Sequence, residues 1–193
     1  MATMLQPAPW RRVKWTRAGQ LAALANAETA LATMQDAPPP LAFALLRADN
    51  PQVALRFMAQ CLPRLEAVRW LNACLARTPA PPPGSARAEL RIGIAAWLAD
   101  PSDKRRRLVF DFAQLVGFEV PEGAAGLAIF LSGGALGPPE LEHGAPPAPG
   151  TFGQALAGAI LLASLAYGTS RFVDELDAML GLGLAIAEME EAP

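Results

Sequence analysis

Prolines divide this sequence into short segments, and within each segment the apolar side chains recur at intervals of three and four residues. The chain of 193 residues has 19 prolines, many of them clustered at 38–40, 79–83 and 138–149. Proline lacks a backbone N–H and ends a helix that runs into it, whereas this apolar spacing is typical of an amphipathic helix. Alanine and leucine dominate, and both enter helices at little cost. We therefore predict an all-α fold, a compact multi-helix array of short helices joined by proline-rich loops.

The same signals predict where the helices lie. Asn50 followed by Pro51 is typical of a helix start, because the asparagine side chain caps the helix and proline is tolerated in the first turn. We expect residues 1–15 to form an irregular N-terminal arm and residues 16–193 to form a single helical domain. The predicted helices cover residues 16–25, 27–34, 41–48, a segment from 51 onward, 63–77, 86–99, 103–116, 121–131, 151–167 and 170–190.

The helix predicted over 103–116 has both an apolar and a basic pattern. Leu108, Phe112 and Leu115 lie at helical spacing, so we expect them to form its buried stripe. Three adjacent arginines at 105–107 cannot share one helix face. At least one of them should therefore point to solvent or toward acidic residues elsewhere in the chain.

Charge is distributed unevenly along the sequence. Residues 1–107 hold 15 of the 16 basic residues and 7 of the 18 acidic ones, a net charge of +8, whereas residues 108–193 have a net charge of −10. Two interpretations are open. The halves fold against each other and neutralise, or the molecule has a dipolar surface that steers partners. No aromatic interleaving accompanies the arginines, so we do not expect nucleic-acid binding.

Cysteine and histidine are too few for a metal site. Cys61 and Cys74 do not form a Cys-x-x-Cys pair, and His143, the single histidine, cannot complete a zinc site with them in any usual spacing. We predict two buried, reduced thiols, no metal, no cofactor and a cytoplasmic location. The uncharged run at 151–170 reaches the length of a membrane span but lacks flanking basic residues, so we do not expect a span.

The small-residue turn Ser132-Gly133-Gly134 is a candidate binding element. Backbone N–H groups in such a turn can hold an anion. The turn lacks the Gly-Lys-Ser/Thr of a phosphate-binding P-loop. The simpler interpretation is a tight turn that follows a helix.

Basic and aromatic side chains supply the other candidate contacts. Arg64, Arg105 and Arg106 are candidates for binding a phosphate or an acidic partner. Trp10 and Trp15 lie in the expected irregular arm, where they either fasten the arm to the domain or anchor a partner. We identify no catalytic residue, because neither a nucleophile nor an acid/base pair accompanies His143.

Three stretches together resemble a bacterial family of uncharacterised helical proteins, classed as a domain of unknown function. They are 55–70, with its Leu-Pro run followed by a basic residue and Glu-Ala-Val; 96–102, with its Trp-Leu-Ala-Asp-Pro-Ser; and 130–138, with its Ser-Gly-Gly and later proline. The resemblance covers about residues 15–187. This chain departs from the family pattern at Gln60, Arg69, Phe130, Leu131 and Ala135.

The resemblance implies a role more than an activity. Genes of such proteins often lie near type VI secretion clusters, which implies an accessory adaptor or chaperone of that system. We therefore expect a non-catalytic interaction protein with a protein partner. The alternative is a small-ligand-binding protein or enzyme that uses the loop at 132–149, since long proline-rich loops often carry function.

Overall fold

The computed structural model describes residues 7–138 and 144–189, and within them the chain forms eight α-helices and no β-strand. The predicted all-α fold is confirmed. The helices are α1 (Pro39–Asp49), α2 (Pro51–Cys61), α3 (Arg64–Arg77), α4 (Ala86–Ala99), α5 (Asp103–Val116), α6 (Pro121–Phe130), α7 (Thr151–Ser164) and α8 (Phe172–Glu188), with 3₁₀ turns η1 (Ala18–Leu21) and η2 (Thr169–Arg171).

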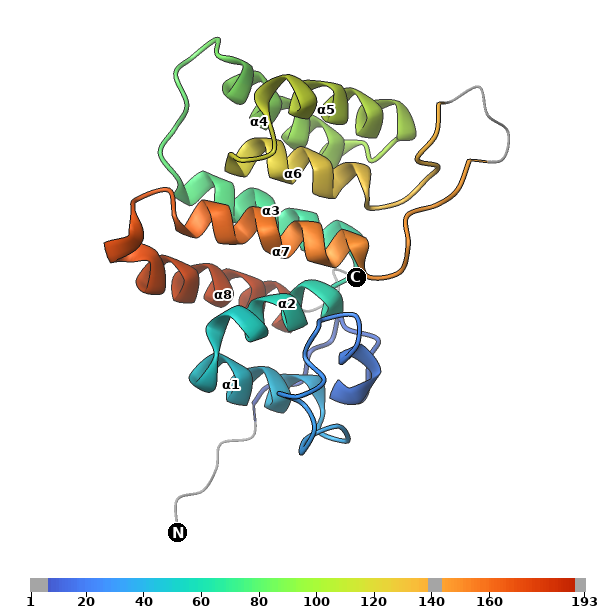
Figure 1. The fold of residues 1–193 in the computed structure, drawn as a ribbon, viewed down its shortest axis with the longest axis vertical. Coiled ribbons are helices and arrows are strands. Elements are labelled where there is room, and N and C mark those ends of the chain that lie inside the picture. The colour runs from blue at the N-terminus through green and yellow to red at the C-terminus, as the bar shows by residue number, and fades with distance from the viewer. Residues whose placement is uncertain (1–6, 139–143, 190–193) are drawn as a thin grey trace.

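The helices are stacked in successive layers (Figure 1). α4 and α5 lie at one end above α6, α3 and α7 cross the middle, and α8, α2 and α1 follow toward the N-terminal segment. Trp70 of α3 is fully buried at the centre, and its Nε1 donates to the Met179 carbonyl of α8 at 2.7 Å. Gly183 leaves room for the Trp70 ring, because a Cβ there would lie 2.7 Å from it.

Helix starts follow the predicted chemistry. Pro39, Pro51 and Pro121 each begin a helix, where a missing N–H leaves no bond unmade. The Asn50 side chain accepts a hydrogen bond from the Val53 backbone N–H at 3.2 Å, which confirms the predicted cap. Both predicted thiols are free and buried, and burial raises the pKa of Cys61 well above its ordinary value.

The two helices predicted over 16–25 and 27–34 are wrong. The segment contains only η1 and a series of turns. Asn26 adopts a left-handed φ of 49°, and the Gly19 backbone N–H donates to the Gln35 carbonyl at 2.8 Å. Two backbone bonds, from Ala18 to Ala37 and from Gly19 to Gln35, thus close the segment into a loop, and the remaining backbone bonds form separate turns instead of a continuous helix. The division of an arm from a domain at residue 15 stays a prediction.

The buried face of α5 differs from the predicted stripe. Leu108 and Leu115 are 52% and 79% exposed, whereas Val109 and Ala113 are buried. Phe112, the third residue of the predicted stripe, is half-buried and packs against the core. The cause is the close approach of α5 to α6, where a Cβ at Gly126 would lie only 2.5 Å from the Ala113 Cβ. Only the face with small side chains fits this crossing, so packing and not hydrophobicity sets the rotation of α5.

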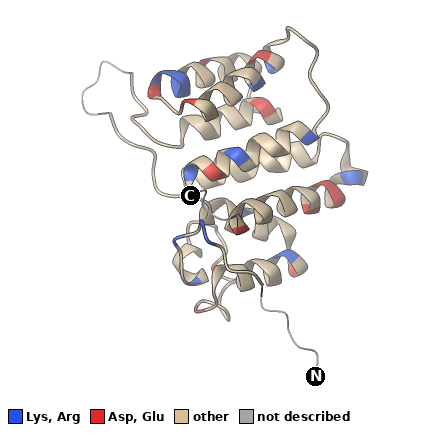
Figure 2. Cartoon of the chain, turned by 180° about the vertical axis from the view of Figure 1, so that it is seen from behind, with Lys and Arg blue, Asp and Glu red and all other residues tan. Residues whose placement is uncertain are grey.

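Opposite charges of the two sequence halves meet in the fold. Figure 2 shows basic and acidic positions side by side on neighbouring helices. At least four ion pairs within the described residues join the halves: Arg47–Asp177, Arg77–Glu175, Arg87–Glu122 and Arg91–Glu122. This arrangement favours the first interpretation of the charge split, in which the halves neutralise each other.

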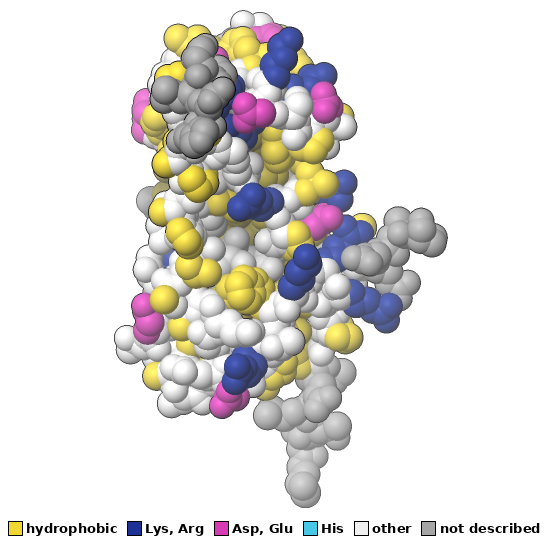
Figure 3. Space-filling model, turned by 90° about the vertical axis from the view of Figure 1, so that its right-hand side faces the viewer, with side chains coloured by type: hydrophobic (Ala, Val, Ile, Leu, Met, Phe, Trp, Pro, Cys, Tyr) yellow, Lys and Arg dark blue, Asp and Glu magenta, His cyan; other side chains and the backbone are white. Residues whose placement is uncertain are grey.

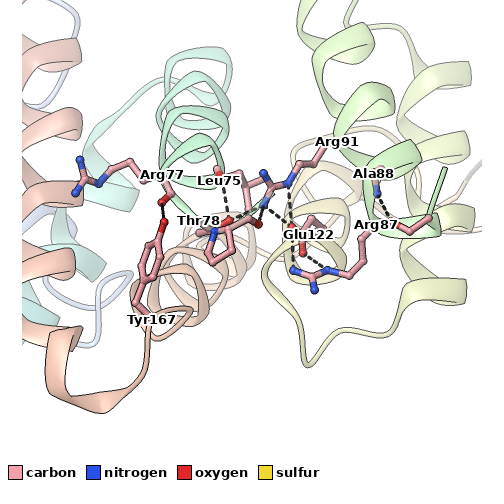
Figure 4. Close-up of polar contacts among 10 residues, drawn as sticks. Leu75, Arg77, Thr78, Arg87, Ala88, Arg91, Glu122 and Tyr167 are labelled. Carbon is pink, nitrogen blue, oxygen red and sulfur yellow. Dashed lines mark hydrogen bonds and ion pairs between the residues drawn. The ribbon is translucent and has the colours of Figure 1, made fainter. Parts of the chain in front are cut away.

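Glu122 joins α4 to α6 through a buried charge cluster (Figure 4). Its side chain is fully buried and accepts hydrogen bonds from Arg87 Nε and Arg91 Nε, each at 2.9 Å. Arg91 also donates to Thr78 Oγ1 at the end of α3. Burial raises the pKa of Glu122 and is the largest single effect, but the hydrogen bonds from both arginines outweigh it, so the pKa lies below its ordinary value.

No single helix in the described part of the chain is long and apolar enough to cross a membrane. α7 reaches the required length only together with residues Thr169–Glu188, and a bend of 108° separates the two segments.

Replacing Glu122 with alanine should lower the free energy of unfolding by about 3 kcal/mol, because it leaves two arginines without their buried partner. The lower end of the range for buried pairs applies, since the arginines keep part of their hydration. Asp36→Ala is the control, because that carboxylate is 90% exposed in its pair with Arg17, and it should change stability by less than about 0.5 kcal/mol. Urea denaturation at neutral pH, followed by circular dichroism, measures both; equal effects would contradict the structural role of Glu122.

Stability should also decrease in acid. The pKa of Glu122 is lower in the folded chain than in the unfolded chain, so the unfolded chain binds more protons as the pH falls. Asp103 and Asp177 shift in the same direction. The free energy of unfolding should therefore be level at neutral pH and fall below about pH 4.5, the ordinary value for glutamate. Denaturation between about pH 3 and pH 6 measures this slope, which Glu122→Gln should make shallower.

Candidate functional site

A small cavity lies where α3 and α5 begin and α4 and α6 end, on the side of the molecule that Figure 3 faces. Its volume is about 350 Å³. We call it the turn cavity; it is lined by residues 64–65, Trp97, residues 101–103, Arg106 and the turn 132–134. On this face, basic side chains follow one another down the middle of the molecule, with hydrophobic side chains between them (Figure 3).

Arg106 holds the turn in place. It is 4% exposed, and it donates to the carbonyls of Phe130 at 2.6 Å and Ala135 at 3.0 Å. Its guanidinium also lies over the Phe130 ring, 4.6 Å from the ring centre. Arg107 adds hydrogen bonds to the carbonyls of Ala135 and Gly137. The two arginines thus fix the backbone that follows α6 against the start of α5.

The turn cavity has an excess of positive charge. Asp103 is the one carboxylate in its lining, and it is shared by Arg106 at 2.6 Å and Arg107 at 2.8 Å. The hydrogen bonds from Arg107 and Arg106 lower the pKa of Asp103, so it stays ionised. Arg106 and Asp103 balance each other within the lining, and Arg107, which shares Asp103 from outside the lining, leaves the cluster as a whole positive.

Arg64 adds an uncompensated positive charge to the lining itself. It lies in the first turn of α3 and is exposed. It is the only arginine within residues 7–138 and 144–189 that has neither a hydrogen bond nor an ion pair. A Cβ at Gly133 would lie 2.9 Å from Arg64 Nη1, so the missing side chain lets the guanidinium rest on the turn.

Neutral donors complete the wall. Ser132 is 5% exposed, and its hydroxyl bonds to no other described residue. Trp97 also lines the cavity, but its indole N–H has no accessible surface and has no acceptor in the described part of the chain. Ser102 lies at the N-cap of α5 but its side chain makes no capping bond. The positive ends of the α3 and α5 dipoles add to this field. The arrangement is suited to binding a carboxylate or another oxyanion.

The structure brings together five of the eight residues singled out from the sequence: Arg64, Arg106, Ser132, Gly133 and Gly134. It separates the other three. Arg105 points outward and pairs with Asp100 at 2.9 Å. Trp10 is buried against Phe43, with ring centres 5.3 Å apart, so it fastens the N-terminal segment. Trp15 is 37% exposed and lies beside a neighbouring cavity.

Trp97, Ser102 and Asp103 were not among the sequence candidates. Trp97 lies on an apolar helix face and Ser102 in a helix-start signal, so each has an ordinary structural interpretation. His143 lies outside the described residues. No three His, Cys, Asp or Glu side chains in the described ranges lie close enough together to hold a metal ion.

Comparison with known proteins identifies the family to which the chain belongs. The sequence profile of DUF6931, a family of unknown function, matches residues 41–187, and the chain belongs to this family. The match includes the whole turn cavity. No curated protein and no solved structure matches the chain.

Replacing Gly134 with alanine should destabilise the turn by more than its backbone strain alone. Gly134 has φ +69°, and a Cβ there would lie 2.7 Å from Arg106 Nη2 and 2.9 Å from Asp103 Oδ1. Gly84→Ala is the matched control, because Gly84 has φ +73° with open space around it. We expect a loss of about 1 kcal/mol for Gly84→Ala and about 2–3 kcal/mol for Gly134→Ala. Urea denaturation measures the difference, and equal losses would contradict the tight packing of the turn on Arg106.

Proposed function

We propose that this member of DUF6931 is a non-catalytic interaction protein that holds an acidic side chain of a protein partner in the turn cavity. The observation that carries the proposal is the unpaired Arg64, which gives the wall an uncompensated positive charge beside the Arg106–Asp103–Arg107 cluster. A carboxylate supplied by a partner would accept from Arg64 and from the Ser132 hydroxyl. Charge-assisted hydrogen bonds of this kind are the strong ones in protein recognition.

A macromolecular partner suits the cavity better than a metabolite. Its volume of about 350 Å³ is near the lower limit for small-molecule sites, which range from about 300 to 1,000 Å³. Arg64 is exposed at its mouth, where a protruding side chain reaches it without burial of a whole ligand. Exposed arginine and tryptophan are the side chains enriched at the energetic centres of protein interfaces.

The specific form of this proposal is an adaptor or chaperone of a type VI secretion component in the cytoplasm. The sequence resemblance supports the assignment to that system, and the two free, buried thiols Cys61 and Cys74 are in keeping with a reducing compartment. A second candidate is a small-ligand-binding protein or enzyme that uses the 132–149 loop. The presence of Ser132 and the adjacent glycines in the cavity wall supports it.

Substitution of Arg64 should strongly reduce binding of the protein partner. Tagged wild-type, Arg64→Gln and Arg105→Gln chains are expressed in the native host, cross-linked and isolated at low and high salt. Arg105→Gln is the matched control, because it makes the same charge change outside the cavity. We expect recovery of the partner to fall about tenfold or more with Arg64→Gln alone, and to fall with salt for the wild type.

Equal recovery with all three chains would overturn the proposal. A partner that depends on Arg64 but is not a type VI secretion component would overturn only the adaptor assignment. Arg64-dependent capture of a small molecule without any protein would favour the second candidate.

A further inference from the structure

A second cavity adjoins the turn cavity on the other side of Arg64. Its volume is about 500 Å³, and it is lined by Lys14 and Trp15, residues 59–64, Leu131, residues 147–150, Phe152 and Gly153. We call it the tryptophan cavity. Neighbouring residues of the same segments line the two cavities, with Pro63 and Leu131 on one side and Leu65 and Ser132 on the other. Arg64 belongs to both linings and therefore stands between them.

The tryptophan cavity also has an excess of positive charge. Its lining contains two cations, Lys14 and Arg64, and no aspartate or glutamate. Lys14 is exposed and, like Arg64, has no hydrogen bond or ion pair with any residue in the described ranges. A segment that crosses both cavities therefore meets positive charge on either side of Arg64, which favours an acidic one.

Part of the wall of the tryptophan cavity is apolar. The Trp15 ring is 37% exposed, and Phe152 and Pro147 are half-buried opposite the end of α2. Gln60 ties the loop to α2, because its Nε2 donates to the Gly150 carbonyl at 2.9 Å and to the Leu24 carbonyl at 3.0 Å. An aromatic and proline-lined hollow whose loop is bonded to α2 is suited to an apolar side chain.

We propose that the two cavities together bind one peptide segment of the partner, with an acidic side chain in the turn cavity and a neighbouring large apolar side chain in the tryptophan cavity. This inference rests on the proposed function, which concerns the turn cavity alone. It adds the second binding position and the chemistry of the segment. Arg64 contacts the segment where the acidic and apolar positions meet.

Selection from a random peptide display library tests this inference. The immobilised full chain is compared with Arg64→Gln, Trp15→Ala and the control Arg105→Gln. We expect the wild type and Arg105→Gln to enrich aspartate or glutamate adjacent to leucine, isoleucine or phenylalanine. Arg64→Gln should lose the enrichment, whereas Trp15→Ala should keep the acidic preference and lose the apolar one.

The consensus peptide from this selection is then titrated into ¹⁵N-labelled protein. The indole N–H signals of Trp97 and Trp15 report the two cavities separately, and both should shift. Replacing the apolar residue of the peptide with alanine should weaken binding about tenfold and leave the Trp15 signal unmoved. The spectrum of Trp15→Ala shows directly whether that variant is folded; if it is not, the alanine peptide on the wild-type chain gives the same comparison.

The possible negative results distinguish the two-cavity inference from the proposed function. Acidic enrichment without an apolar preference, or an unmoved Trp15 signal with the consensus peptide, would overturn the inference and leave the proposed function intact. Enrichment that is the same for the wild type and Arg64→Gln, or no enrichment at all, would overturn the inference and count against the proposed function as well.

Discussion

The close approach of α5 to α6 at Ala113 and Gly126 determines the rest of this end of the molecule. A helix crossing that leaves no room for a Cβ admits one face of α5 only. The choice of face turns Arg106 inward to the carbonyls of the 130–135 turn and turns Arg105 outward to Asp100. The position of one glycine thereby decides which of three adjacent arginines builds the cavity.

Helix positions could be predicted from the sequence because their signals are local. The ranges 86–99 and 103–116 have the same ends in the structure as in the prediction; the Ser85 side chain caps the first helix, and Gly117, with a positive φ, ends the second. The prediction for the N-terminal segment was wrong because the interactions that shape it are not local. Its backbone bonds join residues such as Gly19 and Gln35, and no periodicity in the sequence encodes such a pairing.

The candidate site could be predicted in part. A Ser-Gly-Gly turn and arginines without an evident partner can be recognised in the sequence, but their proximity in the fold cannot. Arg64 and Gly133 are far apart along the chain, and the sequence prediction placed the most apolar face of α5 toward the core. Leu108 and Leu115 are exposed, which shows why that prediction failed. The apolar pattern indicates which faces of a helix could be buried, but close packing against the neighbouring helix decides which face is buried. The unsatisfied indole of Trp97 is visible only in three dimensions.

The charged groups of the turn cavity determine how binding there would depend on pH and ionic strength. Guanidinium groups do not lose their proton in the physiological range, and the lowered pKa of Asp103 keeps that carboxylate ionised through the same range. The electrostatic field of the cavity therefore does not change with pH in the physiological range, in contrast to the field of a site that contains histidine. Ionic strength, which screens the exposed Arg64, is the variable to which such a contact would be sensitive.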